Sequence, residues 1–211
     1  MDWNNDGKKD LIAGDTAGNV TLFLNIGTKE KPELAKGKPV EADGKPITQG
    51  SHKLAEGYAW IHMADWTGDG LKDLFVGHGS MTAFYKNVGN ESSPRFAAPT
   101  LLPAPEGGFP TRPSAYVVDW DGDGKKDLLM GGDQPQIRFY RNIGTNTEPR
   151  LAKAEVLELK GPGADAGYRW RQDVADWNND GKTDLLVGNA YSRTTGATRG
   201  TGGNIWLFLG K

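Results

Sequence analysis

Apolar and polar residues alternate in short runs along most of the chain, a pattern typical of β-strands. Alternating runs that contain aromatic and β-branched residues cover 20–27, 81–89, 136–144 and 204–210. A second kind of run is continuously apolar and ends in glycine, at 11–14, 74–77, 128–131 and 185–188. No segment shows the 3.6-residue period of a helix, so the pattern predicts an all-β chain.

Each continuous apolar run follows the same acidic stretch, D-W-x-x-D-G-x-x-D. The copies begin at residues 2, 65, 119 and 176, which are 63, 54 and 57 residues apart. Repetition at this spacing predicts stacked supersecondary units. Further strands before the acidic stretch (SAYVVD) and after the alternating run (VLELK) bring each unit to four strands. Four antiparallel strands in a repeat of this length predict the blade of a β-propeller.

We therefore predict a single propeller-type repeat domain over 1–211, with about four blades near 1–50, 51–104, 105–160 and 161–211. Two complete four-stranded blades are flanked by two three-stranded ones, because the first strand is missing from the first blade and the fourth from the last. The pattern leaves three arrangements open: a closed four-bladed ring, half of a larger ring completed by a homodimer, and part of a longer propeller.

Composition narrows the class of protein. The chain has no cysteine and a formal net charge of −2, so bulk charge does not indicate a nucleic-acid partner. No apolar run approaches the roughly 20 residues that span a bilayer, and the first residues have no signal-peptide apolar region. We expect neither nucleic-acid binding nor membrane insertion.

The acidic stretches have the spacing of a calcium loop. Side-chain oxygens stand at positions one, three, five and nine, glycine at position six permits a sharp turn, and the carbonyl at position seven can point inward. Ca²⁺ prefers six to eight oxygen ligands, whereas Mg²⁺ demands a stricter octahedron and zinc prefers His or Cys. The loops are not EF-hands, because position twelve is apolar in all four.

These loops, together with the apolar-apolar-Gly strands behind them, resemble the FG-GAP and VCBS repeats, propeller repeats of integrin α-subunits and many secreted bacterial proteins. The resemblance covers essentially the whole chain and implies up to four bound Ca²⁺ ions. Carried over by position, the side-chain ligands are Asp2, Asn4, Asp6 and Asp10; Asp65, Thr67, Asp69 and Asp73; Asp119, Asp121, Asp123 and Asp127; and Asp176, Asn178, Asp180 and Asp184. The carbonyl ligands are those of Lys8, Leu71, Lys125 and Lys182. Thr67 departs from the usual Asp or Asn and offers a weaker donor.

A second candidate site lies on the opposite face of the blades, where aromatic rings and polar groups suit a sugar or a protein surface. Its candidate residues are Tyr58, Trp60, His78, Arg112, Asp133, Gln134, Tyr168, Arg169, Trp170, Tyr191 and Arg193. The last two belong to an insertion at 189–203, which we expect to be a long loop without secondary structure.

The preferred interpretation is a calcium-stabilised binding module for a glycan or a protein surface, located outside the cell, in the periplasm or on the cell surface. A binding module is favoured over an enzyme because the three histidines are scattered and no Ser-His-Asp arrangement is evident. One alternative is part of a calcium-dependent polysaccharide lyase, with His78 or Tyr191 as base. The other is a purely architectural repeat fragment.

Overall fold

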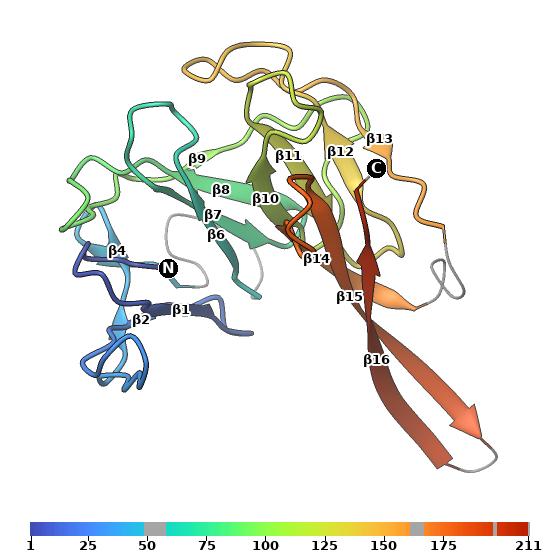
Figure 1. Cartoon of the computed structure of the whole chain (residues 1–211), viewed down its shortest axis with the longest axis horizontal. Coiled ribbons are helices and arrows are strands. Elements are labelled where there is room, and N and C mark those ends of the chain that lie inside the picture. Colours follow the sequence, from blue (N-terminus) through green and yellow to red (C-terminus); the bar gives the residue numbers. More distant parts are fainter. Residues whose placement is uncertain (49–57, 161–166, 196–197, 211) are drawn as a thin grey trace. The chain divides into compact units, whose positions relative to one another are not determined.

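The computed structural model describes residues 1–48, 58–160, 167–195 and 198–210. In this part of the chain it has sixteen β-strands and no helix, which confirms the all-β prediction (Figure 1). The chain forms two compact units, Met1–Pro103 (unit 1) and Ala104–Lys211 (unit 2). Every strand pairing is antiparallel.

Unit 1 contains a three-stranded sheet and a four-stranded sheet, each with its strands in chain order. The three-stranded sheet consists of β1 (Leu11–Gly14), β2 (Val20–Phe23) and β3 (Lys38–Pro39). The four-stranded sheet consists of β6 (Trp60–Ala64), β7 (Asp73–His78), β8 (Met81–Tyr85) and β9 (Thr100–Leu101). Between these sheets along the chain there is a small hairpin that the sequence pattern does not predict. It consists of β4 (Glu41–Ala42) and β5 (Lys45–Pro46).

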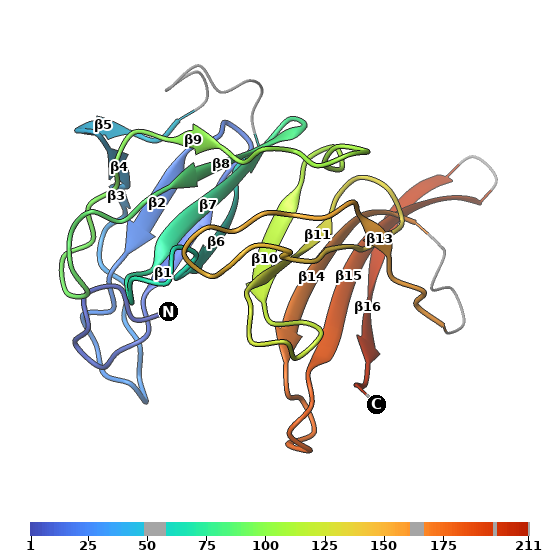
Figure 2. The same cartoon turned by 90° about the horizontal axis from the view of Figure 1, so that it is seen from above.

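Unit 2 has one four-stranded and one three-stranded sheet, again in chain order (Figure 2). The first consists of β10 (Ser114–Val118), β11 (Asp127–Gly131), β12 (Arg138–Tyr140) and β13 (Glu155–Val156). The second consists of β14 (Tyr168–Ala175), β15 (Asp184–Thr195) and β16 (Thr198–Phe208). The main sheets thus have the strand content expected of the blades, while closure of blades into a propeller ring stays a prediction.

The continuous apolar runs are explained by the place of their strands in the sheets. β7 and β11 each lie between two other strands, and every one of their residues is buried. A strand that is covered on both faces carries apolar residues at consecutive positions. β1 has a neighbour on one side only, and its four residues are half-buried or exposed.

Each unit has its own apolar core. The core of unit 1 is built from several sheets and the segments that follow them, and includes Val20, Val40, Ile47, Leu74, Val76, Tyr85 and Phe96. The core of unit 2 draws on β11, β12, β14 and β15 and includes Leu129, Ile137, Phe139, Trp170, Leu185 and Val187. These cores hold the ends of the strands, and therefore the acidic loops, in fixed positions.

The insertion at 189–203 is not an unstructured loop, so that expectation was wrong. The ladder between β15 and β16 runs without interruption from Leu185↔Phe208 to Thr195↔Thr198, and the hairpin extends past β14 (Figure 1). The strands continue because the insertion keeps the register of the sheet. Glycine on one strand also makes room for an aromatic ring on the other, since a Cβ on Gly202 would come within 2.8 Å of the Tyr191 ring.

Candidate metal centres and ligand face

The four acidic loops share one backbone shape, which two left-handed residues create. Position six is glycine in every loop, with φ between 81° and 85°. Position four is also left-handed, with φ between 57° and 75°, and is occupied by Asn5, Gly68, Gly122 and Asn179. Gly and Asn are the residues that adopt this conformation most readily. The recurrence of Asn or Gly at position four is a signal that the spacing of acidic residues alone does not reveal.

The carboxylate at position one is held inside the turn by backbone amides. It accepts a hydrogen bond from the position-six glycine at 2.9, 3.2, 2.9 and 2.9 Å in the four loops in order. The carboxylate at position five similarly accepts from the position-seven amide at 2.9 to 3.0 Å. These bonds fix the direction of two acidic side chains in each loop.

The carboxylate at position nine is the most buried part of each loop. Asp10 is 6% exposed, and Asp73, Asp127 and Asp184 are fully buried. One oxygen accepts from the position-two tryptophan amide at 2.7 to 3.1 Å. The other accepts at 2.7 to 2.9 Å from an amide two residues past β2, β8, β12 or β16. Through these hydrogen bonds, the aspartate connects the start and the end of the loop with the segment that follows a neighbouring strand.

In three repeats, the residue past the strand whose amide donates to the position-nine aspartate is an asparagine. Our sequence analysis did not assign this asparagine to the site. Asn25, Asn87 and Asn142 are buried. The side-chain oxygen of each accepts from the amides two and eight residues further on, at 2.9 to 3.2 Å. The signal was the recurrent Asn-x-Gly after each alternating run. Gly210 occupies this place in the fourth repeat.

The third loop gathers its acidic side chains most closely. Carboxylate oxygens of Asp119, Asp121 and Asp127 lie within 4.8 Å of one another, the only such group of three among the described residues. Asp123 instead forms an ion pair with Lys125 at 3.1 Å, and Arg141 forms one with Asp121. Three oxygens of this kind, at this spacing, are hard donors that suit Ca²⁺.

The electrostatics of the second and third loops agree with a place for a cation, whereas in the fourth the Gly210 amide lowers the pKa of Asp184. Burial raises the pKa of Asp73 and Asp127, because a charged carboxylate is disfavoured away from water. The Lys125 amide lowers the pKa of the more exposed Asp123. A divalent cation beside the buried carboxylates would offset the cost of keeping them ionised.

Position three differs among the other loops. The amide nitrogens of Asn4 and Asn178 donate to the position-five carboxylate at 3.2 and 3.1 Å. The Asn4 Oδ1 atom is buried and accepts no hydrogen bond in the described part of the chain, as expected of an oxygen reserved for a cation. The Thr67 hydroxyl lies 3.4 Å from Asp73 and donates to it. The Asn178 Oδ1 atom instead accepts from the Asp180 amide at 3.1 Å, so the first loop fits the predicted cation better than the second and fourth.

In unit 1 the predicted ligand face forms a shallow hollow. Tyr58 and Trp60 line it together with Asp15 and Thr16, and Trp60 is 37% exposed. His78, predicted for the same face, is 1% exposed instead, because it lies at the end of the central strand β7. Burial lowers its pKa, so His78 is a neutral interior residue.

In unit 2 the predicted face gathers arginines around one aspartate. Asp133 pairs with Arg112 at 3.5 Å and with Arg171 at 3.8 Å. The sequence analysis missed Arg171 because nothing in the sequence distinguishes it from the neighbouring Arg169. The guanidinium of Arg169 lies elsewhere, 5.6 Å from the centre of the Tyr168 ring. Burial lowers the pKa of Arg171 to about 10.

The remaining predicted residues of unit 2 differ in exposure. Trp170 is 2% exposed and belongs to the core, while Gln134 and Tyr191 are half-buried. The side chain of Arg193 lies outside the described residues. The predicted faces of both units share a backbone feature, non-glycine residues in the left-handed conformation. These are Tyr58, Arg112 and Arg169, with φ of 70°, 51° and 57°. Non-glycine residues in this conformation are uncommon and cluster at functional sites.

Comparison with known proteins identifies the repeat. A family model described as FG-GAP-like repeat matches three times, at residues 2–76, 65–130 and 119–187. Among solved structures, the Tc holotoxin pore of Photorhabdus luminescens is similar, with 20% identity and a TM-score of 0.47 over 85% of this chain. The chain spans 8% of that chain's length. No curated protein matches it. No described helix is long and apolar enough to cross a membrane.

Proposed function

From the premise that the chain belongs to the FG-GAP-like repeat family, we propose that it is a calcium-binding β-propeller module that recognises a glycan or a protein surface. The observation that carries the proposal is the shared construction of the four loops. All four use the same hydrogen bonds to aim acidic side chains into a turn, and the third brings three carboxylates within 4.8 Å of one another. Such loops are costly without a counter-ion.

Up to four Ca²⁺ ions would be held, one in each loop. The residues that would hold them are the side chains at positions one, three, five and nine, with the position-seven carbonyl as a further ligand. The ion supplies positive charge that neutralises the loop and ties two strands together. Because the unfolded chain has no such arrangement, binding would add directly to the stability of the fold.

The ligand would bind on the opposite face, for which the two units offer different chemistry. The hollow with Tyr58 and Trp60 in unit 1 suits stacking on a sugar ring. The cluster with Arg112 and Arg171 in unit 2 suits a carboxylate or another acidic group. We propose a location outside the cell, in the periplasm or on the cell surface, since many proteins with these repeats are secreted.

The geometry favours a binding module over a polysaccharide lyase. His78, one of the two bases considered for a lyase, is buried. The other, Tyr191, lies in the β15–β16 ladder opposite Gly202. The alternative is a purely architectural role, which would be favoured if a search for ligands found none.

Self-association into a larger ring is a further part of the proposal. β1 and β16 are edge strands of their sheets, and Leu11 and Ile205 on them are 46% and 80% exposed. Exposed sheet edges favour pairing with another chain. Light scattering in calcium tests this point, since a monomer of 22.8 kDa with a cooperative melt contradicts it.

The central experiment is calorimetric titration of calcium, followed by a glycan array with and without the ion. We expect calcium to bind more tightly than magnesium and array signals to require it. Substitution of Trp60→Ala or Arg112→Ala should remove those signals and leave calcium binding unchanged. Absence of calcium binding would overturn the metal assignment, whereas calcium binding without any glycan signal would favour a protein ligand or an architectural role.

A further inference from the structure

The residue seven positions before the second, third and fourth acidic loops has the same unusual backbone each time. Tyr58, Arg112 and Arg169 stand there, and all three are left-handed. A large side chain in this conformation is strained, and glycine would avoid the strain. The recurrence of Tyr and Arg at such a position indicates that their side chains have a task other than shaping the chain.

Backbone hydrogen bonds establish which residues of the two units correspond. Tyr58 donates its amide hydrogen to the Thr16 carbonyl at 3.2 Å, and Arg169 donates to the Asp133 carbonyl at 3.1 Å. Thr16 and Asp133 each stand fourteen residues after the first aspartate of an acidic loop. The two units therefore carry Tyr58 and Arg169 at the same place of the same scaffold.

Two residues further along the strand the units differ in the same way. Unit 1 has Trp60 there and unit 2 has Arg171. Trp60 lines a hollow together with Thr16, whereas Arg171 forms an ion pair with Asp133. Equivalent positions thus provide aromatic rings in unit 1 and guanidinium groups in unit 2. Rings suit stacking on a sugar, and guanidinium groups suit an anion.

The arginines of unit 2 gather around one guanidinium that is largely removed from water. The side chain of Arg171 is 14% exposed. Burial is the main cause of its lowered pKa; the charges of Arg169 and Arg112 lower that pKa further, whereas Asp133 raises it. With a pKa of about 10, Arg171 stays charged at neutral pH. Because burial and like charges both oppose this charge, a further anion at the cluster would stabilise it.

Asp133 acts on these arginines over relatively long distances. Its carboxylate oxygens lie 3.5 Å from a nitrogen of Arg112 and 3.8 Å from one of Arg171, compared with about 2.7–2.9 Å in a charge-assisted hydrogen bond. The Oδ1 atom of Asp133 is buried and accepts no hydrogen bond from the described residues. Asp133 therefore interacts with the guanidinium groups mainly through charge, which a second carboxylate can share.

An aromatic ring beside the cluster indicates which kind of anion fits. The guanidinium of the exposed Arg169 lies 5.6 Å from the centre of the half-buried Tyr168 ring. An aromatic ring can pack against the apolar face of a pyranose, and arginine can bind a carboxylate through two parallel hydrogen bonds. A uronic acid carries its carboxylate directly on such a ring, whereas an acidic peptide side chain has no ring. The combination favours an acidic sugar.

We propose that the unit 2 part of the ligand face binds the carboxylate of a uronic acid in a polysaccharide. Arg112 and Arg169 would bind the carboxylate, the Tyr168 ring would lie against the sugar ring, and Arg171 would act as a positioning residue that keeps the site positive. This inference rests on the proposed ligand face and names the sugar class that the face selects.

The test compares trisaccharides of glucuronate and galacturonate with their methyl esters, titrated into the full chain in saturating calcium. The ester removes the negative charge and keeps the sugar ring. We expect each acid to bind at least about tenfold more tightly than its ester, as expected for hydrogen bonds to a charged group, and the difference should shrink as salt rises. Equal binding of acid and ester overturns the proposal. So does a triglutamate peptide that binds as tightly as the acids, because the partner is then an acidic peptide.

Variants of the protein locate the carboxylate. Arg112→Gln and Arg169→Gln should each lower the ratio of acid to ester affinity at least about tenfold. The ratio is the readout because partial unfolding of a variant lowers both affinities alike. An unchanged ratio in both variants overturns the proposal.

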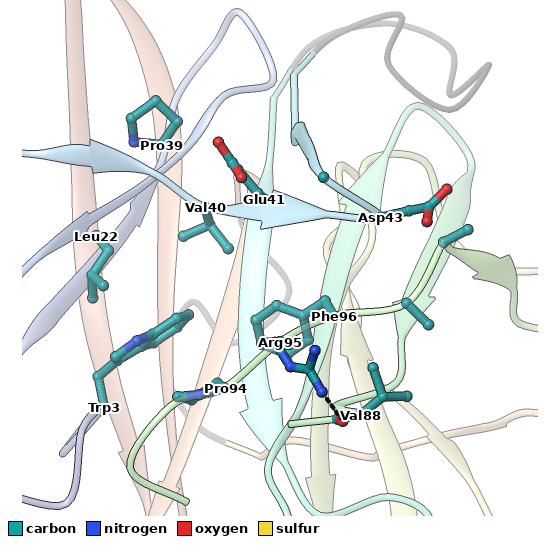
Figure 3. A pocket seen from close by; sticks show the side chains of 13 residues that line it. Trp3, Leu22, Pro39, Val40, Glu41, Asp43, Val88, Pro94, Arg95 and Phe96 are labelled. Atoms are coloured by element: carbon teal, nitrogen blue, oxygen red, sulfur yellow. Dashed lines mark hydrogen bonds between the residues drawn. The ribbon is translucent and has the colours of Figure 1, made fainter. Parts of the chain in front are cut away.

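Arg150→Gln is the matched control, since it removes the same charge from unit 2 at a different place. The exposed Arg150 donates to the Ile143 carbonyl at 3.5 Å. Its counterpart Arg95 donates to the Val88 carbonyl at 3.2 Å (Figure 3). We expect Arg150→Gln to leave the ratio unchanged, and an effect as large as that of Arg112→Gln overturns the proposal in favour of bulk charge.

The glycan array separates failure of this inference from failure of the proposed function. Signals from neutral sugars alone contradict a uronic acid and leave glycan recognition standing. An array without any signal contradicts both.

Discussion

The second and third loops have the same backbone and differ in the side chain at position three. In both, the position-nine carboxylate is buried and accepts hydrogen bonds from the position-two amide and from an amide past the neighbouring strand. Asp73 accepts a third, from the Thr67 amide at 3.3 Å. In the third loop, Asp121 brings a further carboxylate to Asp119 and Asp127. In the second loop, Thr67 instead donates its hydroxyl to Asp73.

This difference separates two tasks that the acidic residues perform. The conformation of the loop depends on positions one, five and nine, which are aspartate in all four copies and bind backbone amides. Position three hydrogen-bonds to this framework in a different way from loop to loop, and its residue varies among Asn, Thr and Asp. We infer that the framework residues determine stability without metal, and that position three adjusts the affinity for the cation.

Removal of the metal should have the largest effect, because it acts on every loop at once. Each site occupied at 100 times its Kd adds about 2.7 kcal/mol to the free energy of unfolding. Since 1 kcal/mol moves the Tm of a chain of this size by roughly 2–4 °C, we expect a chelator to lower the Tm by at least about 10 °C. Differential scanning calorimetry measures this, with calcium and magnesium added back separately. An unchanged Tm in excess chelator contradicts a structural role for calcium.

Substitution at position nine should destabilise the two loops equally. Asp73→Ala and Asp127→Ala each leave at least two backbone N–H groups in the loop region without an acceptor, which costs about 2–4 kcal/mol. We expect this loss in urea unfolding even in the presence of a chelator. Thr67→Ala is the matched control and should cost much less. If the position-nine variants lose stability only when calcium is present, these residues act as ligands alone and the framework role is wrong.

An exchange at position three should alter metal affinity and leave the framework intact. Because ligand charge adjusts the affinity of calcium loops, we expect Thr67→Asp to tighten the second site about tenfold. Asp121→Thr should weaken the third by a similar factor, or about 1.4 kcal/mol. Calcium titration calorimetry measures both, and urea unfolding in chelator should show little change. Equal affinities in the variants and the parent would show that position three is not a ligand.

The smallest expected effect concerns a basic residue beside each of these two loops. Lys86 pairs with Asp69 at 3.2 Å, and Arg141 pairs with Asp121. Leu24 and Leu209 hold the same position in the other repeats, so leucine is the natural control. Lys86→Leu and Arg141→Leu should tighten calcium binding roughly two- to fivefold at low salt, since exposed ion pairs are worth under about 1 kcal/mol. The gain should shrink as salt rises, and a gain that is independent of salt would contradict competition between charges.

The sequence predicted the strands and loops well because both depend on local patterns. Alternation indicated β2, β8, β12 and β16, and four copies of one acidic stretch indicated four equivalent turns. The burial of the position-nine aspartates could not be predicted, because it depends on an amide of another strand, as in the contact of Asp127 with Asn142. That contact is set by strand register.

The ligand face was harder to predict because position along a strand does not reveal exposure. Trp170 follows the exposed Arg169 in β14, and His78 is the last residue of β7, yet both side chains are buried. Arg171 was missed for the opposite reason, since only the fold brings it to Asp133. The insertion at 189–203 contains glycine and threonine, which are common in loops, and its pairing became visible only with the register of β15 and β16.

The hydrogen bonds of the position-nine aspartates also bear on the order in which the repeats fold. In the first three repeats the bond joins residues 14 or 15 apart, whereas Asp184 and Gly210 are 26 apart. Closing the longer segment costs roughly 0.5 kcal/mol more in chain entropy. The β15–β16 ladder shortens the search, because pairing that starts at Thr195 and Thr198 can propagate residue by residue toward Asp184. The projecting hairpin would then act as the starting point from which the last repeat assembles, and its shortening would slow refolding of that repeat without changing the other three.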